Sequence, residues 1–407
     1  MRILQVNQYY YPRGGADKYF LDLSQALEDA GHQVAVFSMQ HPKNQNSVYG
    51  KYFVSRVSFN AGLGLANALK IPARVLYSFE AKRKFKQLVK EFKPEIIHLH
   101  NIYHHLSPSI LSVAKKNKIP VVMHLHDYKL VCPNHMLFTG GKYCEKCRPN
   151  KYYNCLKHRC IKESFFGSLL GAFEMYFHHS ILKVYEKNIS LFIAPSRFMK
   201  ETCVRFGWDE KKIEVVYNSY SASFLSAPLE APGTSSDYLL YFGRLGREKG
   251  LETLLNALPA TRERLLIAGS GEEEEKLKQK ALLNSLSVKF LGFKSGEELR
   301  DLILKAKAVI MPSIWAENMP LSLLEAMSLN KVVIASCFGG FPEIIKNGEN
   351  GLLFTPGDFR DLAQQINSLT ELDLGAMQKK AGETAAQFQP AKNLAEVLAI
   401  YQRLLKL

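Results

Sequence analysis

The chain has 407 residues, and 53 lysines and arginines against 38 aspartates and glutamates give it a formal net charge of +15. Hydrophobic residues make up 47% and charged residues 22%, which excludes a globally disordered chain. The length suffices for two or three domains, each with its own core. The positive excess indicates an anionic partner: a nucleic acid, an anionic membrane face or a phosphorylated ligand.

No segment is apolar for long enough to predict a transmembrane helix. The apolar run 165–173, for example, ends at Glu174, well short of the ~18 residues that a span needs. Only four residues separate Arg2 from Asn7, too few for the apolar core of a signal peptide. We therefore expect a cytoplasmic protein with reduced cysteines, and peripheral attachment to the inner membrane face stays open.

The first half of the chain alternates between predicted strands and helices. A strand at 3–7 leads into the loop glycines Gly14 and Gly15, a helix over 16–30 and a strand at 34–37. This order predicts a βαβ unit and a parallel sheet. The elements expected next are a helix over 65–92, strands at 95–100 and 120–126, a long helix over 164–187 and a strand at 191–194.

The same order restarts in the second half, with a strand at 238–242, a glycine loop and a helix over 251–258. We therefore predict an α/β fold with two doubly wound, Rossmann-like domains that face each other across a ligand-binding cleft. The predicted parts are a first domain (1–217) with a cysteine-rich insertion (127–162), a linker (218–237), a second domain (238–388) and a C-terminal helix (389–407) that returns to the first domain.

Two cationic side chains lie in the glycine loop of the second half. Arg244 and Lys249 are five positions apart, and a forked guanidinium with a point charge suits a diphosphate. A solvated basic loop explains the same residues equally well.

A second candidate segment runs from Glu317 to Glu325, after a predicted strand at 308–311. We expect a helix from Pro320 to Leu329, whose first turn offers backbone N–H groups to an anion. The two carboxylates could address different hydroxyls of one extended ligand, although spacing alone favours a purely structural role for both.

In this order and spacing, these segments resemble glycosyltransferase family 4, a family of retaining enzymes with the GT-B fold. The resemblance covers nearly the whole chain. It includes Gly14-Gly15, the strand end at His126, the Arg244/Lys249 loop and the Glu317–Glu325 segment. It also includes two later motifs, Gly339-Gly340-Phe341-Pro342-Glu343 and Asn350-Gly351-Leu352-Leu353.

The resemblance implies a hexosyltransferase that uses a nucleoside-diphosphate sugar to build a cell-surface polysaccharide or a glycolipid. Arg244, Lys249 and Gly15 would then bind the diphosphate, and His126 would contact the transferred sugar. Glu317 would contact sugar hydroxyls, and Glu325 the ribose. The remaining donor-side residues implied are Phe293, Asn318, Met319, Pro320 and Leu321. On the acceptor side we place His100, Tyr10 and Asp127.

We expect catalysis without a metal ion. Breaking the sugar–diphosphate bond builds negative charge on the leaving group, and no Asp-x-Asp pair is present to hold a divalent ion. Arg244, Lys249 and a helix N-terminus can neutralise that charge instead. Family precedent favours retention through a front-face mechanism, in which the leaving phosphate helps to deprotonate the acceptor.

Two His-Leu-His triplets place pairs of imidazoles on one face of a strand, at His98/His100 and His124/His126. We expect His100 and His126 to line the cleft, with His98 and His124 in the interior. A metal site made of these four histidines is the less favoured reading.

Five of the seven cysteines fall within the insertion, and Cys144 and Cys147 have the C-x₂-C spacing of a zinc knuckle. With Cys155 and Cys160 they could hold a structural zinc ion, and Cys132 could replace any of the four. Scattered reduced thiols are the alternative.

Basic and aromatic residues concentrate in the first domain, at Tyr9–Tyr11, Lys82–Lys86 and Lys151–Tyr153. One reading is an acceptor and membrane surface, and the other is a solvated helix face. The competing functions are a nucleotide-sugar epimerase or phosphorylase of the same fold and, in a different class, a zinc-containing nucleic-acid-binding protein. We expect no nucleic-acid partner, because no recognisable nucleic-acid-binding module is present.

Overall fold

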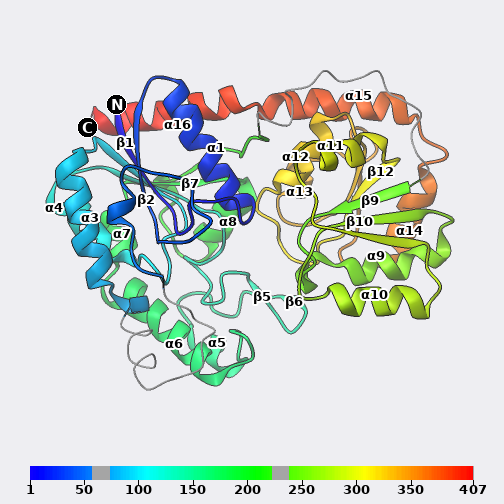
Figure 1. The fold of residues 1–407 in the computed structure, drawn as a ribbon. Coiled ribbons are helices and arrows are strands. Elements are labelled where there is room, and N and C mark those ends of the chain that lie inside the picture. The colour runs from blue at the N-terminus through cyan, green and yellow to red at the C-terminus, as the bar shows by residue number, and fades with distance from the viewer. Residues whose placement is uncertain (57–73, 222–237, 407) are drawn as a thin grey trace. The chain divides into compact units, whose positions relative to one another are not determined.

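The computed structural model describes residues 1–56, 74–221 and 238–406 (Figure 1). The chain divides into two compact units. Most of the predicted linker, and the start of the predicted helix over 65–92, lie outside the described residues. The first unit consists of Met1–Met136, Glu145–Val216 and Leu394–Leu407, and the second of Leu137–Cys144 and Tyr217–Asn393.

The first unit is built on a sheet of six strands in the order β2-β1-β3-β4-β7-β8, and every neighbouring pair is parallel. The residues of β3, β4 and β7 are buried along their whole length, as expected of a parallel sheet covered on both faces. The strands are β1 (Arg2–Val6), β2 (Gln33–Phe37), β3 (Ile96–Leu99), β4 (Val121–His124), β7 (Leu191–Ala194) and β8 (Ile213–Val215).

Helices connect these strands, and several begin at a serine cap. Ser78 accepts a hydrogen bond from the amide of Ala81 at the start of α3, and Ser164 accepts one from Gly167 at the start of α6. The helices of this unit are α1 (Gly15–Asp29), α3 (Phe79–Phe92), α4 (Leu111–Lys116), α5 (Tyr153–Lys157), α6 (Phe165–Met175), α7 (Val184–Asn188) and α8 (Arg197–Arg205).

The second unit contains another parallel sheet, in the order β11-β10-β9-β12-β13-β14. Its strands are β9 (Tyr238–Phe242), β10 (Arg264–Ala268), β11 (Val288–Gly292), β12 (Ala308–Met311), β13 (Val333–Ser336) and β14 (Leu352–Phe354). A short hairpin of β5 (Phe138–Thr139) and β6 (Lys142–Tyr143) also belongs to this unit.

Alternate residues of β9 feed two apolar cores on opposite faces of this sheet. Leu239 and Tyr241 pack with side chains of α9 and α14, whereas Leu240 and Phe242 pack with side chains of α11 and α12. The helices are α9 (Leu251–Ala257), α10 (Glu274–Leu283), α11 (Gly296–Lys305), α12 (Leu321–Ser328), α13 (Phe341–Ile344), α14 (Phe359–Ser368), α15 (Leu374–Ala385) and α16 (Pro390–Leu405). The predicted architecture of two doubly wound α/β units is thus confirmed.

Helix α16 begins in the second unit and ends in the first. Its Tyr401 is fully buried, and the hydroxyl lies 2.6 Å from Nδ1 of His98 in β3. The last helix is therefore part of the core of the first unit.

The single helix predicted over 164–187 is wrong. Helix α6 ends at Met175, a π-type turn η3 (Tyr176–Ile181) follows, and Lys183 adopts a left-handed conformation with φ 50° before α7 begins. Contacts distant in sequence accompany the break, because His178 hydrogen-bonds to the carbonyl of Leu76. The apolar pattern of the segment continues through the break and therefore conceals it.

The cysteine-rich insertion is not one structural part of the first unit. Its hairpin packs within the second unit, where the ring of Tyr143 lies 5.0 Å from that of Phe338 and Gly141 lies against Arg247. Of the four predicted zinc ligands, Cys144 thus belongs to the second unit and the other three to the first. No helix within the described ranges is long and apolar enough to cross a bilayer.

Candidate active site

In the second unit, the two predicted cations lie between the end of β9 and the start of α9. The guanidinium of Arg244 is 57% exposed and lies 2.5 Å from the buried carboxylate of Glu248. Lys249 is more enclosed, at 22% exposed. Ligands of doubly wound sheets bind at the carboxyl ends of the strands, which is where both side chains lie.

Lys249 forms an ion pair with Glu317, the residue that the sequence singled out 68 positions later. The Nζ–Oε1 distance is 2.6 Å, and the hydroxyl of Ser313 donates to the same oxygen at 2.6 Å. Burial acts most strongly to raise the pKa of Glu317, but the adjacent Lys249 ammonium and the hydrogen bonds to the carboxylate together keep that pKa below its ordinary value. Hydrogen bonds from Ser313 and Trp315 act in the same direction, so the carboxylate is ionised at neutral pH.

The two glycines of the Gly339-Gly340 motif support the Glu317 backbone. The amide of Gly340 donates to the carbonyl of Glu317 at 2.7 Å. A Cβ atom on Gly340 would lie 2.0 Å from the carbonyl oxygen of Asn318, and one on Gly339 would lie 2.4 Å from that of Glu317. Only glycine allows this approach, which holds the end of the loop before α12 in place.

The other donor-side residues lie in different environments. Asn318, Met319 and Glu325 are buried, and the Met319 side chain belongs to the apolar core, so its backbone is the part suited to a ligand. Pro320 caps α12 instead of lying in its first turn, and Leu321 is the first helical residue. Phe293 lies apart from this cluster, in the loop after β11, and is 75% exposed.

In the first unit, the four predicted histidines form one stack at the ends of β3 and β4. The ring centroids of His100 and His126 are 5.1 Å apart, and those of His124 and His126 are 4.4 Å apart. His98, His100 and His124 are buried, whereas His126 is half-buried. The prediction that His100 lines a cleft is wrong, because its side chain is fully enclosed and instead supports His126.

A chain of hydrogen bonds fixes the orientation of the His126 ring. Gln5 Oε1 lies 2.8 Å from His100 Nε2, and His100 Nδ1 lies 2.8 Å from His126 Nε2. The Gln5 amide nitrogen points the other way, toward the Tyr401 hydroxyl. Because Gln5 Oε1 can only accept, His100 carries its proton on Nε2 and His126 donates from Nε2. This tautomer leaves Nδ1 of His126 as a hydrogen-bond acceptor.

These buried imidazoles are neutral at pH 7. Burial, reinforced by the neighbouring rings, lowers the pKa values of His98, His100 and His126 well below that of an exposed histidine. A neutral His126 orients or accepts from a hydroxyl group and does not supply a positive charge.

We expect the chain to lose stability on mild acidification. From pH 7 to 5.5, a histidine that stays neutral when folded and has a pKa of ~6.5 when unfolded lowers the free energy of unfolding by about 1.2 kcal/mol. His98 and His100 together give about 2.5 kcal/mol. His105 acts in the same direction, because burial lowers its pKa to about 3. Asp17 opposes them, since burial raises its pKa to about 6, and it offsets about 0.8 kcal/mol.

The measurement is urea unfolding at pH 7 and 5.5, with an expected net loss of at least about 1.7 kcal/mol. In Asp17→Asn the opposing contribution disappears, so the loss should be larger. A stability that is flat over this range would mean that the stacked histidines take up protons as readily in the folded chain as in the unfolded one.

The glycine loop of the first unit places Gly15 as the first residue of α1. The helix begins without a side-chain cap on its N-terminus. Asp17, in the first turn, accepts a hydrogen bond from Asn7 at 2.8 Å and is buried. The loop thus has an acidic residue beside its glycines, which the sequence did not single out.

The two remaining acceptor-side residues have mainly structural contacts. Tyr10 packs against Phe20 and Phe53, with ring centroids 6.1 and 6.0 Å away. Asp127 accepts a hydrogen bond from the amide of Lys129 at 2.9 Å, and burial raises its pKa. Neither contact identifies a ligand.

The zinc site stays a prediction, and Cys155 interacts with Cys160, Cys132 and Cys147. In the part of the chain that the structure describes, no group of three or more histidine, cysteine, aspartate or glutamate side chains is arranged to hold a metal ion. Cys155 and Cys160 do share a hydrogen bond between their thiols. The boundary between the two units falls directly after Cys144, so Cys144 and Cys147 are assigned to different units.

Sequence reasoning missed Ser313, Trp315 and Glu248 in the second unit and Gln5 and Tyr401 in the first. Ser313 and Trp315 alternate with Glu317 along the chain and carry a hydroxyl and an indole N–H. This spacing is a signal from which both could have been predicted to lie beside Glu317. Tyr401 has no such signal, because it approaches His98 from the opposite end of the chain.

Two family models match the chain, "Glycosyltransferase Family 4" over residues 13–223 and "Glycosyl transferases group 1" over residues 228–388. Among curated relatives, the phosphatidyl-myo-inositol mannosyltransferase of Mycolicibacterium smegmatis is 24% identical over 99% of this chain and 94% of its own length. The glycogen synthase of Mycobacterium tuberculosis is also 24% identical, over 94% of this chain and 88% of its own.

Solved structures show the same fold. Anabaena Alr3699/HepE, solved in complex with UDP and glucose, superposes with a TM-score of 0.69 at 21% identity, over 99% of this chain and 100% of its own. The first family model alone matches more than half of the residues, and the Lys249–Glu317 pair and the histidine stack lie at the strand ends where such enzymes bind ligands. The chain therefore belongs to glycosyltransferase family 4 and is a glycosyltransferase of the GT-B fold.

Proposed function

We propose that this enzyme transfers a hexose from a nucleoside-diphosphate sugar to a glycan or lipid-linked acceptor, as a step in the synthesis of a cell-surface polysaccharide or glycolipid. The observation that carries the proposal is the ion pair between the half-buried Lys249 and the buried Glu317, with the exposed guanidinium of Arg244 in the same loop as the lysine. An ammonium and a guanidinium at the carboxyl end of a parallel sheet suit a diphosphate, and an ionised carboxylate suits sugar hydroxyls.

The names of similar proteins support both parts of the proposal. HepE was solved with UDP-glucose, which supports a nucleotide-sugar donor. Another structure of this fold is a lipopolysaccharide outer core galactosyltransferase, WaaB, and the mycobacterial mannosyltransferase is named for phosphatidyl-myo-inositol. Acceptors of this kind are glycans or lipids with a polar headgroup.

The proposed mechanism neutralises the leaving group with the chain's own charges. As the bond between the sugar and the diphosphate lengthens, negative charge builds on the phosphate oxygens. Arg244, Lys249 and the N-terminus of α12 supply positive charge and N–H groups there. The sequence contains no Asp-x-Asp pair, so we propose that no divalent ion is needed for this step.

On the acceptor side, His126 is the residue that we assign to the reacting sugar. Its ring is held by His100 through Nε2, which fixes the orientation of the imidazole toward the reacting sugar. We propose retention of the anomeric configuration, with the leaving phosphate helping to deprotonate the acceptor hydroxyl, because none of the described residues is placed as a covalent nucleophile.

The test is an assay of the purified chain with UDP-, GDP- and ADP-sugars, each with lipid-extract and free-glycan acceptors, in EDTA and in magnesium. We expect labelled product from at least one donor, at the same rate in both conditions. Strict dependence on added magnesium would contradict the metal-independent step. Isomerised donor without any acceptor would identify an epimerase, and release by inorganic phosphate a phosphorylase.

A further inference from the structure

Helix α6 carries large apolar side chains on the side that faces solvent. Its buried residues are Ser168, Gly171, Ala172, Glu174 and Met175, and a Cβ atom on Gly171 would lie 2.3 Å from Ile161. A surface helix normally turns polar residues outward, so the apolar outer side of α6 departs from that pattern. The outer residues, with their exposed fractions, are Phe165 (48%), Phe166 (77%), Leu169 (44%) and Phe173 (49%).

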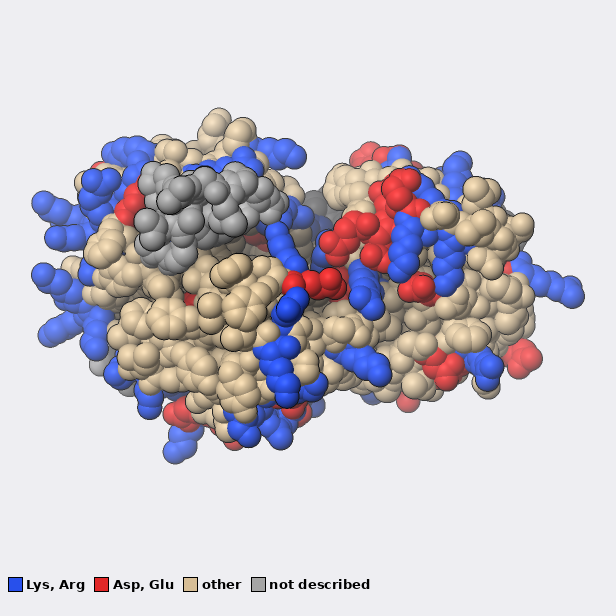
Figure 2. All heavy atoms as spheres, turned by 90° about the horizontal axis from the view of Figure 1, so that it is seen from below, with Lys and Arg blue, Asp and Glu red and all other residues tan. Residues whose placement is uncertain are grey.

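The apolar surface continues past the end of the helix, where Ile181 is 65% and Leu182 41% exposed. We call the six residues Phe165, Phe166, Leu169, Phe173, Ile181 and Leu182 the α6 apolar face. Figure 2 shows the molecule from below, where the first unit presents a broad area with few charged side chains, bordered mainly by lysine and arginine and by a few acidic residues. Contiguous apolar surface of this kind is typical of interaction sites.

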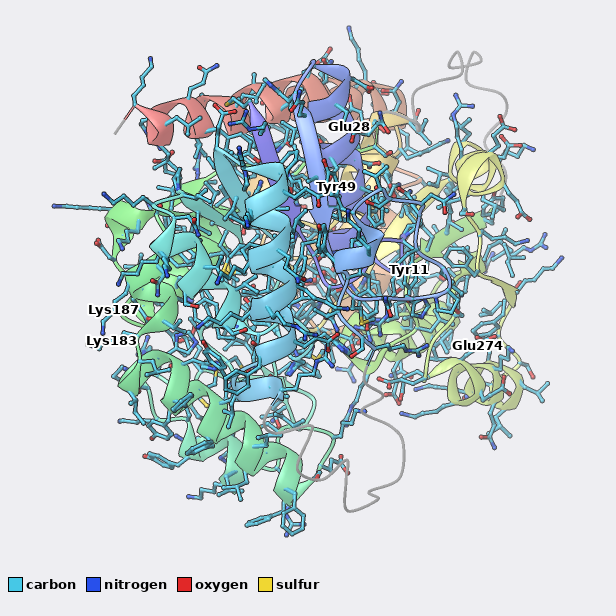
Figure 3. The ribbon with its side chains drawn as sticks, turned by 60° about the vertical axis from the view of Figure 1, so that its left-hand side comes forward. Tyr11, Glu28, Tyr49, Lys183, Lys187 and Glu274 are labelled. Atoms are coloured by element: carbon cyan, nitrogen blue, oxygen red, sulfur yellow. The ribbon has the colours of Figure 1, made fainter. Side chains whose placement is uncertain are left out.

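The charges beside this face are almost all positive. Between residues 151 and 187, Glu163 is the exposed carboxylate, because Glu174 is buried and Glu186 is half-buried against His179. Lys183 and Lys187 extend outward from α7 in Figure 3. The exposed cations of the segment are Lys151, Lys157, Arg159, Lys162, Lys183 and Lys187. Aromatic and aliphatic side chains bordered by cations match the interface of an anionic bilayer in both polarity and charge.

The inner side of α6 is tied to the segment that follows His126. Glu174 forms an ion pair with Lys129 at 2.7 Å, and both side chains are 3% exposed. This pair ties α6 to the segment around Lys129, three residues after His126.

We propose that the α6 apolar face inserts into the headgroup region of an anionic lipid bilayer and holds the enzyme at the membrane that contains its acceptor. The identity of the acceptor rests on the proposed function, but the insertion of the α6 apolar face into a bilayer does not depend on it. Attachment of this kind is reversible, since it combines a few buried rings with about 1 kcal/mol from each lysine or arginine near the surface.

The basic run at Lys82–Lys86, which the sequence suggested as the membrane surface, is less suited to this role. Lys84 donates to the carbonyl of Phe53 and pairs with Glu80, with 19% of its side chain exposed. Lys82 bonds to the hydroxyl of Tyr77 at 2.6 Å. Two of the three lysines are thus engaged within the first unit, and none lies on an apolar helix face like that of α6.

The experiment is sedimentation of the full chain with vesicles of phosphatidylcholine alone and of phosphatidylcholine with phosphatidylglycerol at three to one. The test variant is Phe166→Ser/Phe173→Ser. The matched control is Leu282→Ser/Leu283→Ser, which removes two leucines that are 80% and 76% exposed on α10 of the second unit. Calorimetric titration of UDP and analytical ultracentrifugation accompany each variant.

We expect the native chain to bind the anionic vesicles, and to bind them less as salt rises. The test variant should lose at least tenfold in partitioning, because each ring withdrawn from the interface changes it by about tenfold, while the control keeps native binding. UDP binding should be the same in the native chain, the test variant and the control. A failure of the membrane proposal can therefore be distinguished from a failure of the donor assignment. Equal sedimentation of test variant and native chain would overturn the proposal. The proposal would also be overturned if the native chain bound no vesicles and formed a dimer that the test variant abolishes. The α6 apolar face would then be a protein interface.

Discussion

Replacing Lys249 with methionine is expected to lower the rate of sugar transfer by a factor of about 10² to 10³. The substitution keeps most of the buried stem but removes the ammonium that we assign to the diphosphate. It also leaves the carboxylate of Glu317 without its cationic partner in a buried site. The kcat and KM values for the donor are the measurement, with circular dichroism to show that the fold is retained.

The matched control is Lys280→Met, at a lysine of the same unit that is 25% exposed and pairs with Glu252 on the surface. It should have nearly native kinetics, because surface pairs contribute little. If Lys249→Met keeps more than a tenth of native turnover, Lys249 is not part of the reacting site. The double variant Lys249→Met/Glu317→Gln distinguishes loss of the pair from loss of each group. If the two groups act together, the losses of turnover in the two single variants do not add up to the loss in the double variant.

The buried pair between Lys129 and Glu174 should dominate the stability of the segment next to His126. Glu174→Gln and Lys129→Met each leave one uncompensated charge or polar group in the interior, with an expected loss of about 3–5 kcal/mol in the free energy of unfolding. The double variant Lys129→Met/Glu174→Leu should recover most of this loss, because two apolar side chains of similar size need no partner. Urea unfolding followed by fluorescence measures all three.

A single-variant loss below about 1 kcal/mol would show that water reaches the pair. If the double variant is as unstable as the single ones, the lost interaction is instead that of Glu174 with His178. His178 lies 3.9 Å from Glu174 and would lose its own partner in the double variant.

The strands were predictable because their residues are continuous apolar runs between turns. The predicted strands at 191–194 and 238–242 coincide with β7 and β9, and 34–37 differs from β2 by one residue at one end. Helix α1 was predicted with its ends shifted by one residue, since its apolar positions repeat at the helical spacing.

What the sequence could not reveal depends on contacts between distant residues. The break after Met175 involves a hydrogen bond from His178 to Leu76, and no local residue marks it. His100 was expected to line the cleft because it lies near a strand end, but Gln5 and the neighbouring rings of other elements enclose it.

The sequence predicted the charged residues of the candidate site but not the residues that support them. Lys249 and Glu317 were named separately, and the structure joins them at 2.6 Å. Ser313 and Trp315 hydrogen-bond to the Glu317 carboxylate and are uncharged. No charge pattern in the sequence therefore marks them.

The most direct test of the account is calorimetric titration of UDP, GDP and ADP into the native chain and into Arg244→Ala and Lys249→Met, in EDTA. We predict that at least one nucleoside diphosphate binds the native chain, and that each variant weakens it by about 30- to 1000-fold, the effect of losing a charge-assisted contact worth about 2–4 kcal/mol. Native affinity in both variants would contradict the assignment of this loop to the donor diphosphate.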